Sequence, residues 1–101
     1  MKMLLTVEFP LEPFNTYVRD GSAGEKIGRI LESIKPESTC FTEQDGSRGG
    51  VFLIDVENSS DIPKFAEPFF LVFKASCKFR IAMDPKDLQM AGLEELGKQW
   101  R

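Results

Sequence analysis

The chain has 101 residues, of which 29% are charged and 42% are hydrophobic, and its formal net charge at pH 7 is -3. This length predicts a single domain over residues 1–101 with one modest core. The acidic balance argues against nucleic-acid binding, because affinity for a phosphate backbone depends on clustered Lys and Arg. No apolar run approaches the roughly 20 residues of a membrane span, and the N-terminus lacks the apolar core of a secretory signal. We therefore expect a cytoplasmic protein that contacts neither nucleic acid nor membrane.

The residue types that are missing limit the possible chemistry. The sequence contains no histidine and two cysteines, Cys40 and Cys77. Without histidine, the Ser-His and Cys-His pairs of nucleophilic catalysis and the common zinc and haem ligand sets cannot form. Two well-separated cysteines do not make a metal knuckle or a disulfide framework. We therefore expect no metal site and no cofactor.

The first third of the chain predicts a strand followed by a helix. From Met3 to Phe9, apolar side chains occupy alternate positions, which is typical of a strand with one buried face. Ser22 and Glu25 have the spacing of a capping box, and we expect the helix that they begin to end before Pro36.

A β-hairpin is predicted next. Residues 37–43 are short and polar, which favours a strand at the edge of a sheet. Asp45-Gly46 is a typical hairpin turn. The stretch GGVFLIDVE at residues 49–57 contains a run of apolar β-formers, so we expect a central strand that is buried on both faces near its middle.

The last part of the chain completes the pattern with a helix, a strand and a second helix. Ser60 is the expected N-cap of the first helix, which Pro68 should kink or split. Residues 76–83 alternate as a strand, and Asp84-Pro85 begins a helix that runs to the C-terminus.

The order β-α-β-β-α-β with a C-terminal helix predicts an α+β fold of the ferredoxin-like type. We expect a four-stranded antiparallel sheet whose helices cover one face. The first and third strands should lie at its centre, parallel to each other, with the other two at the edges.

The strand alternation leaves a second sheet face that is mixed in character and that the helices do not cover. Two such faces could pack together in a homodimer and enclose a barrel-like interior that could bind a small molecule. The alternative is a sheet face that is exposed to solvent and laced with salt bridges. The ionisable and hydroxyl side chains expected on this face are Thr6, Glu8, Asp55, Lys78 and Arg80.

These side chains are the candidate site. Glu8 and Asp55 are candidate catalytic residues, because two carboxylates on neighbouring strands raise one pKa and can poise a general base near neutral pH. Lys78 and Arg80, with Thr6 beside them, are candidate ligand-binding residues for an anionic group.

Four short motifs stand out: SRGG at 47–50, SDIP at 60–63, AEPFF at 66–70 and PKDL at 85–88. Together they resemble a family of small bacterial proteins of unknown function. More distantly, the architecture resembles the dimeric α+β barrel superfamily, which includes muconolactone isomerase-like proteins, cofactor-free monooxygenases and haem-degrading enzymes. The resemblance implies a ferredoxin-like fold and a homodimer, and it assigns no catalytic residue. It draws attention to Arg48, which could bind a ligand anion or simply be a solvated arginine in a turn.

Three functions therefore stay open, and the sequence does not decide whether the protein is an enzyme. The first is an intracellular homodimer that binds a small anionic or aromatic ligand. The second is a cofactor-independent enzyme, isomerase-like or monooxygenase-like, that uses a carboxylate base. The third is a module that binds another protein through the exposed strand at 37–43.

Overall fold

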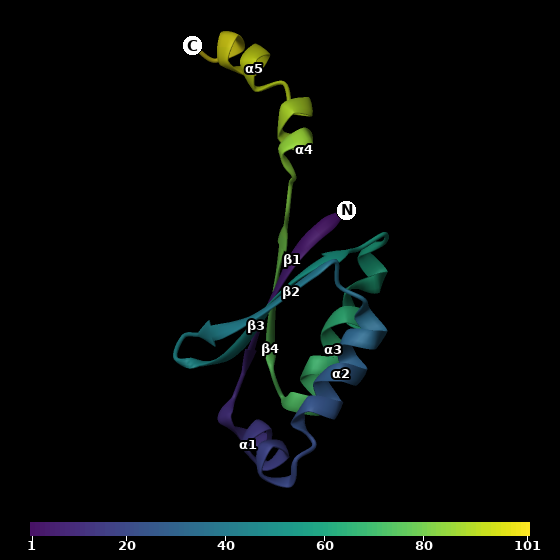
Figure 1. The fold of residues 1–101 in the computed structure, drawn as a ribbon. Coiled ribbons are helices and arrows are strands. Elements are labelled where there is room, and N and C mark those ends of the chain that lie inside the picture. The colour runs from purple at the N-terminus through teal and green to yellow at the C-terminus, as the bar shows by residue number, and fades with distance from the viewer.

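The computed structural model describes residues 1–101. A four-stranded sheet carries helices α2 and α3 side by side on one face, while α1 closes one end of the body (Figure 1). Helices α4 and α5 extend away from the other end. The elements in chain order are β1 (Lys2–Phe9), α1 (Leu11–Asp20), α2 (Ala23–Ile34), β2 (Ser38–Gln44), β3 (Ser47–Asp55), the 3-10 turn η1 (Ser59–Asp61), α3 (Ile62–Phe73), β4 (Ser76–Ile81), α4 (Pro85–Met90) and α5 (Leu93–Gln99).

The strand order is β2-β3-β1-β4, and every neighbouring pair is antiparallel. This order confirms the predicted α+β, ferredoxin-like sheet with β1 and β3 at its centre. The expectation that β1 and β3 run parallel is wrong. The crossover through α1 and α2 returns β2 in the direction of β1, and the tight hairpin then reverses the chain, so β3 opposes β1.

The core lies between the sheet and the helices, and it is rich in aromatic rings. Phe73 is fully buried and meets the ring of Phe9 edge to face, with the centroids 5.1 Å apart. Burying one such side chain stabilises the fold by about 1.5–3 kcal/mol, so this cluster fixes the helices on one face. The core residues with almost no exposed surface are Leu5, Val7, Phe9, Phe52, Ile54, Phe69 and Phe73.

The predicted hairpin turn is confirmed. Asp45 and Gly46 form the two-residue connection between β2 and β3, with φ angles of 51° and 82°. Two successive positive φ angles match the right-handed twist of the flanking strands, and glycine adopts the second without strain.

Three details at the helix ends differ from the expectations. Ser22 does not cap α2 through its side chain, because its hydroxyl donates to Asp20 Oδ1 at 2.6 Å. The capping box before α3 is formed by Asn58 and Asp61, two residues earlier than the expected Ser60. Pro68 lies inside α3, which continues from Ile62 to Phe73, so of the two expected effects the split into two helices does not occur.

The C-terminal segment forms two short helices in place of the single predicted helix. Asp84 caps α4, as expected, by accepting a hydrogen bond from the Asp87 N–H at 2.9 Å. Gly92, with φ of 74°, then breaks the chain direction between α4 and α5. No helix of the protein is both long enough and apolar enough to span a bilayer.

Candidate functional site

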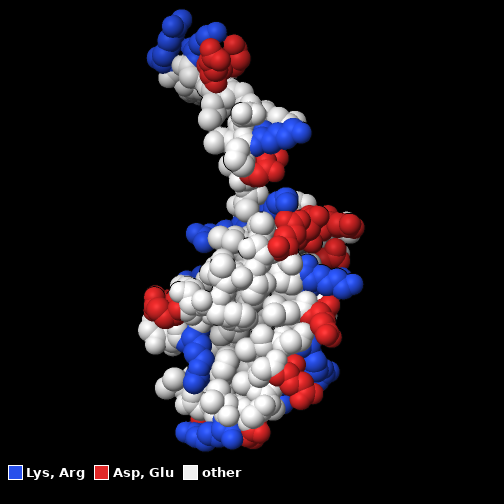
Figure 2. Space-filling view, viewed as in Figure 1, with Lys and Arg blue, Asp and Glu red and all other residues white.

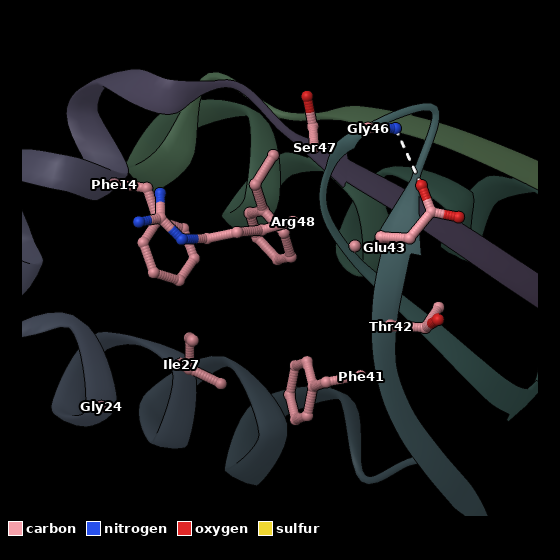
Figure 3. A pocket seen from close by; sticks show the side chains of 11 residues that line it. Phe14, Gly24, Ile27, Phe41, Thr42, Glu43, Gly46, Ser47 and Arg48 are labelled. Atoms are coloured by element: carbon pink, nitrogen blue, oxygen red, sulfur yellow. Dashed lines mark hydrogen bonds between the residues drawn. The ribbon is translucent and has the colours of Figure 1, made fainter.

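A cavity of about 650 Å³ lies between α1, α2 and the β2–β3 hairpin (Figure 3). Its apolar wall brings together side chains from four elements, and its polar side follows the hairpin strands. The apolar residues are Phe9, Phe14, Ile27 and Phe41, and the polar side chains are Thr42, Glu43, Ser47 and Arg48.

The alternation of the hairpin strands places these side chains. In β2, Phe41 and Glu43 are two residues apart, so both point to the helix-covered face of the sheet. Glu43 lies opposite Arg48 in β3, and Arg48 in turn lies opposite Phe9 in β1. The tip of the hairpin projects beyond the helices (Figure 1), so this end of the face is not filled by core side chains. The cavity therefore lies at the edge of the hydrophobic core, beside the hairpin.

Arg48 is the cationic group of the cavity. Its guanidinium lies over the Phe14 ring, 4.4 Å from the centroid, and Nη1 donates to Asn15 Oδ1 at 2.8 Å. Neither contact neutralises the charge, and Arg48 forms no ion pair. A guanidinium carries five N–H donors, so this orientation leaves donors free for an anion.

Glu43 supplies the carboxylate of the cavity. Its side chain accepts the Gly46 N–H at 2.8 Å, which holds it at the turn and away from the Arg48 guanidinium (Figure 3). Glu43 and Arg48 are opposite in register but form no ion pair with each other. Both therefore keep hydrogen-bonding groups free for a bound molecule. No group of three or more potential ligands is close enough to hold a metal ion. Anion binding beside a carboxylate base is the chemistry that the cavity offers.

The open face of the sheet carries the other candidate residues. Thr6 lies opposite Lys78 across the β1–β4 pair, and Arg80 lies opposite Leu4. Thr6, Lys78 and Arg80 line a shallow cavity of about 370 Å³, together with Gln44 and Val51. The structure therefore brings these three predicted ligand-binding residues together, on the face that the sequence predicted.

Charges on the open face are only partly neutralised. Lys2 Nζ donates to the Glu37 carboxylate at 2.7 Å, and this hydrogen bond raises the pKa of the Lys2 ammonium. The N-terminal ammonium lies 3.0 Å from Asp55 Oδ1. Lys78 and Arg80 have no carboxylate partner, so they are the free cations of this face.

The predicted pair of carboxylates does not form within one chain. Asp55 lies opposite Lys2 and Glu8 lies opposite Gly49, so the two side chains are at opposite ends of the β1–β3 ladder. Six residues of strand separate them by about 20 Å. The error follows from the direction of β3, because a parallel β3 would have carried Asp55 toward the Glu8 end.

Sequence reasoning missed most of the cavity. Phe14, Ile27 and Phe41 come from three elements, and nothing in their spacing shows that they meet. The only available signal was Phe41, a large aromatic residue in an otherwise polar strand, whose side chain is 53% exposed. Arg48 is a candidate from the sequence, but its position over the Phe14 ring depends on how α1 packs beside the hairpin.

Comparisons with known proteins support the fold. No protein-family model matches the chain, and no curated protein matches it. One solved structure to which it is similar is 5-chloro-2-hydroxyhydroquinone dehydrochlorinase (TftG) from Burkholderia phenoliruptrix AC1100, in complex with 2,5-dihydroxybenzoquinone. The TM-score is 0.58 and the identity is 16%, with 85% of this chain and 97% of that chain covered. At this identity the likeness supports the α+β fold alone, and the resemblance to a family of small bacterial proteins stays a prediction.

Proposed function

We propose that the cavity between α1, α2 and the hairpin binds a small planar molecule that carries an anionic group. The observation that carries this proposal is Arg48, whose guanidinium is stacked on Phe14 and lacks a carboxylate partner. Aromatic and aliphatic walls would bury the ring, and the guanidinium would bind the anion. The volume of about 650 Å³ falls within the roughly 300–1,000 Å³ that is usual for small-molecule sites.

The structural neighbour suggests a first probe. Its complex contains 2,5-dihydroxybenzoquinone, a single ring with two acidic hydroxyl groups. Such a ligand has the flat apolar surface and the negative charge that the two sides of the cavity would recognise.

Isothermal titration calorimetry with 2,5-dihydroxybenzoquinone and with benzoate tests this proposal. Replacing Arg48 with Gln removes a charge-assisted hydrogen bond, so we expect affinity to fall by about 10- to 100-fold. Arg19→Gln is the matched control, because Arg19 is an exposed arginine on α1 that does not line the cavity. Equal affinities for Arg48→Gln and the unmodified protein would reject the cavity as the binding site.

A second function, proton transfer without a cofactor, is favoured by the position of Glu43 in the same cavity. A carboxylate beside a bound anionic ring could remove a proton while Arg48 stabilises the charge that develops. The printed name of the structural neighbour is that of an enzyme, which is compatible with this function. The test is proton–deuterium exchange of a bound ring hydrogen, which should be lost in Glu43→Gln and kept in Glu8→Gln.

The open face supports the homodimer as part of this proposal. Leu4, Val51 and Leu53 form a half-buried apolar strip along the centre of the face, between the free cations of β4 and the polar residues of β2. Packing two such strips together would cover apolar surface that one chain leaves open. Thr6, Lys78 and Arg80 would then line the interior, where they could bind a second anionic group.

A further inference from the structure

Residues 83–101, here called the C-terminal arm, are all exposed, and no hydrogen bond or salt bridge joins them to the rest of the chain. The last backbone hydrogen bond to the body runs from the Ala82 N–H to the Lys2 carbonyl oxygen at 3.0 Å. Beyond it, the arm forms hydrogen bonds only within itself. Figure 2 shows the arm standing clear of the body, with both charged and uncharged surface.

The two helices of the arm are too short to be stable alone. They contain six and seven residues, whereas isolated helices of fewer than about 12–15 residues are marginal in water. Their stability must therefore come from packing. The arm carries the apolar side chains for this purpose, all of them exposed in the single chain: Met83, Leu88, Met90, Leu93, Leu96 and Trp100.

The open sheet face is the complementary surface in the same sequence. It presents the apolar strip of Leu4, Val51 and Leu53 beside the unpaired cations Lys78 and Arg80. The arm carries carboxylates that have no cation partner, including Glu94 and the capping residues Asp84 and Asp87. The apolar surfaces of the two regions are thus matched. The arm also carries Lys86, Lys98 and Arg101, so the charge match is limited to its unpaired carboxylates and the two cations of the face.

The arm cannot cover the open face of its own chain in this geometry. It continues along the direction of β4 and leaves the sheet at Ile81, so it lies beyond the end of its own sheet (Figure 1). The arm follows the edge strand β4 in the chain, so it leaves the body at the edge of the sheet.

We propose that the C-terminal arm of each chain packs onto a second copy of the same chain, beside its open sheet face. Each copy then gives an arm and receives one, as two-fold symmetry requires. This arrangement rests on the proposed homodimer and adds to it a definite role for residues 83–101.

Trp100 reports on this interface directly, because it is the only tryptophan in the sequence and is 79% exposed in the single chain. Fluorescence emission and acrylamide quenching of the full chain should be recorded across a dilution series, with light scattering giving the mass. At high concentration we expect a mass near twice 11.4 kDa, a blue-shifted emission and quenching reduced several-fold. All three should revert together on dilution.

Two variants and two alternative outcomes distinguish the arm proposal from the homodimer proposal and from the ligand-site proposal. Leu93→Glu should weaken association at least tenfold, whereas Gln99→Glu, which adds the same charge to the same helix, should leave it unchanged. A dimer whose Trp100 stays exposed would overturn the arm proposal and keep the homodimer. A Trp100 that is protected at every dilution in a monomer would mean that the arm folds back on its own chain, and would overturn both. Neither result affects the proposal that the cavity binds a ligand, because the Arg48→Gln titration tests that proposal separately.

Discussion

Replacing Gly50 with alanine should destabilise the protein through a single contact. A Cβ atom at this position would lie 2.7 Å from Cζ and 2.9 Å from Cε2 of the Phe52 ring. That ring has no exposed surface and packs against Phe69, with the centroids 5.4 Å apart, so it has no space into which to move. Overpacking of this kind costs about 1–3 kcal/mol of the free energy of unfolding.

Gly28→Ala is the matched control, and its effect should have the opposite sign. Gly28 lies inside α2, and a Cβ atom there would meet nothing within 4 Å. Alanine in a helix interior is favoured over glycine by about 0.5–1 kcal/mol, so this variant should be more stable than the unmodified protein.

Urea denaturation followed by far-ultraviolet circular dichroism measures both variants. For a chain of this size, a change of 1 kcal/mol corresponds to a shift in Tm of about 4–8 °C, so thermal melting provides a second readout. If Gly50→Ala unfolds at the same urea concentration as Gly28→Ala, then the packing of Phe52 described above is wrong.

Three further predictions concern the core, the thiols and the cavity. Phe73→Ala should lower the free energy of unfolding by about 3–5 kcal/mol, since the ring is fully buried among aromatic neighbours; a loss below about 1 kcal/mol in urea denaturation would contradict the described core. Burial raises the pKa of the Cys77 thiol from 9.0 to about 11. Its thiolate fraction at pH 8 is therefore roughly 100-fold lower than that of a thiol with the ordinary pKa of 9.0. A thiol reagent should therefore label the exposed Cys40 first, and faster labelling of Cys77, checked by peptide mass spectrometry, would refute this order. Glu43→Gln should keep or improve the binding of benzoate, because it removes a negative charge from the lining of the cavity; calorimetry that shows lost binding would contradict the role of Glu43 as a base.

Local patterns predicted the fold well, because alternation and turn chemistry depend on neighbouring residues. The alternation in residues 3–9 assigned the faces of β1, and Asp45-Gly46 fixed the hairpin turn. Helix caps were less predictable, because polar side chains compete for the same donors. Ser22 fits the capping pattern, yet its hydroxyl bonds to Asp20.

The candidate site was predicted correctly only for residues whose sheet face follows from the alternation of one strand. The residues Thr6, Lys78 and Arg80 lie on the open face as expected, because each position follows from the alternation of its own strand. The pairing of Glu8 with Asp55 failed because it also required the direction of a second strand. The cavity was not foreseen, because its walls meet only after α1 and α2 have packed beside the hairpin.

The most direct test of the proposed function is a crystal structure of the full chain with 2,5-dihydroxybenzoquinone. The ring should lie against Phe14 and Phe41, with one negatively charged oxygen within hydrogen-bond distance of the Arg48 guanidinium. A ligand bound only on the open face, beside Lys78 and Arg80, would contradict the assignment of the cavity as the functional site.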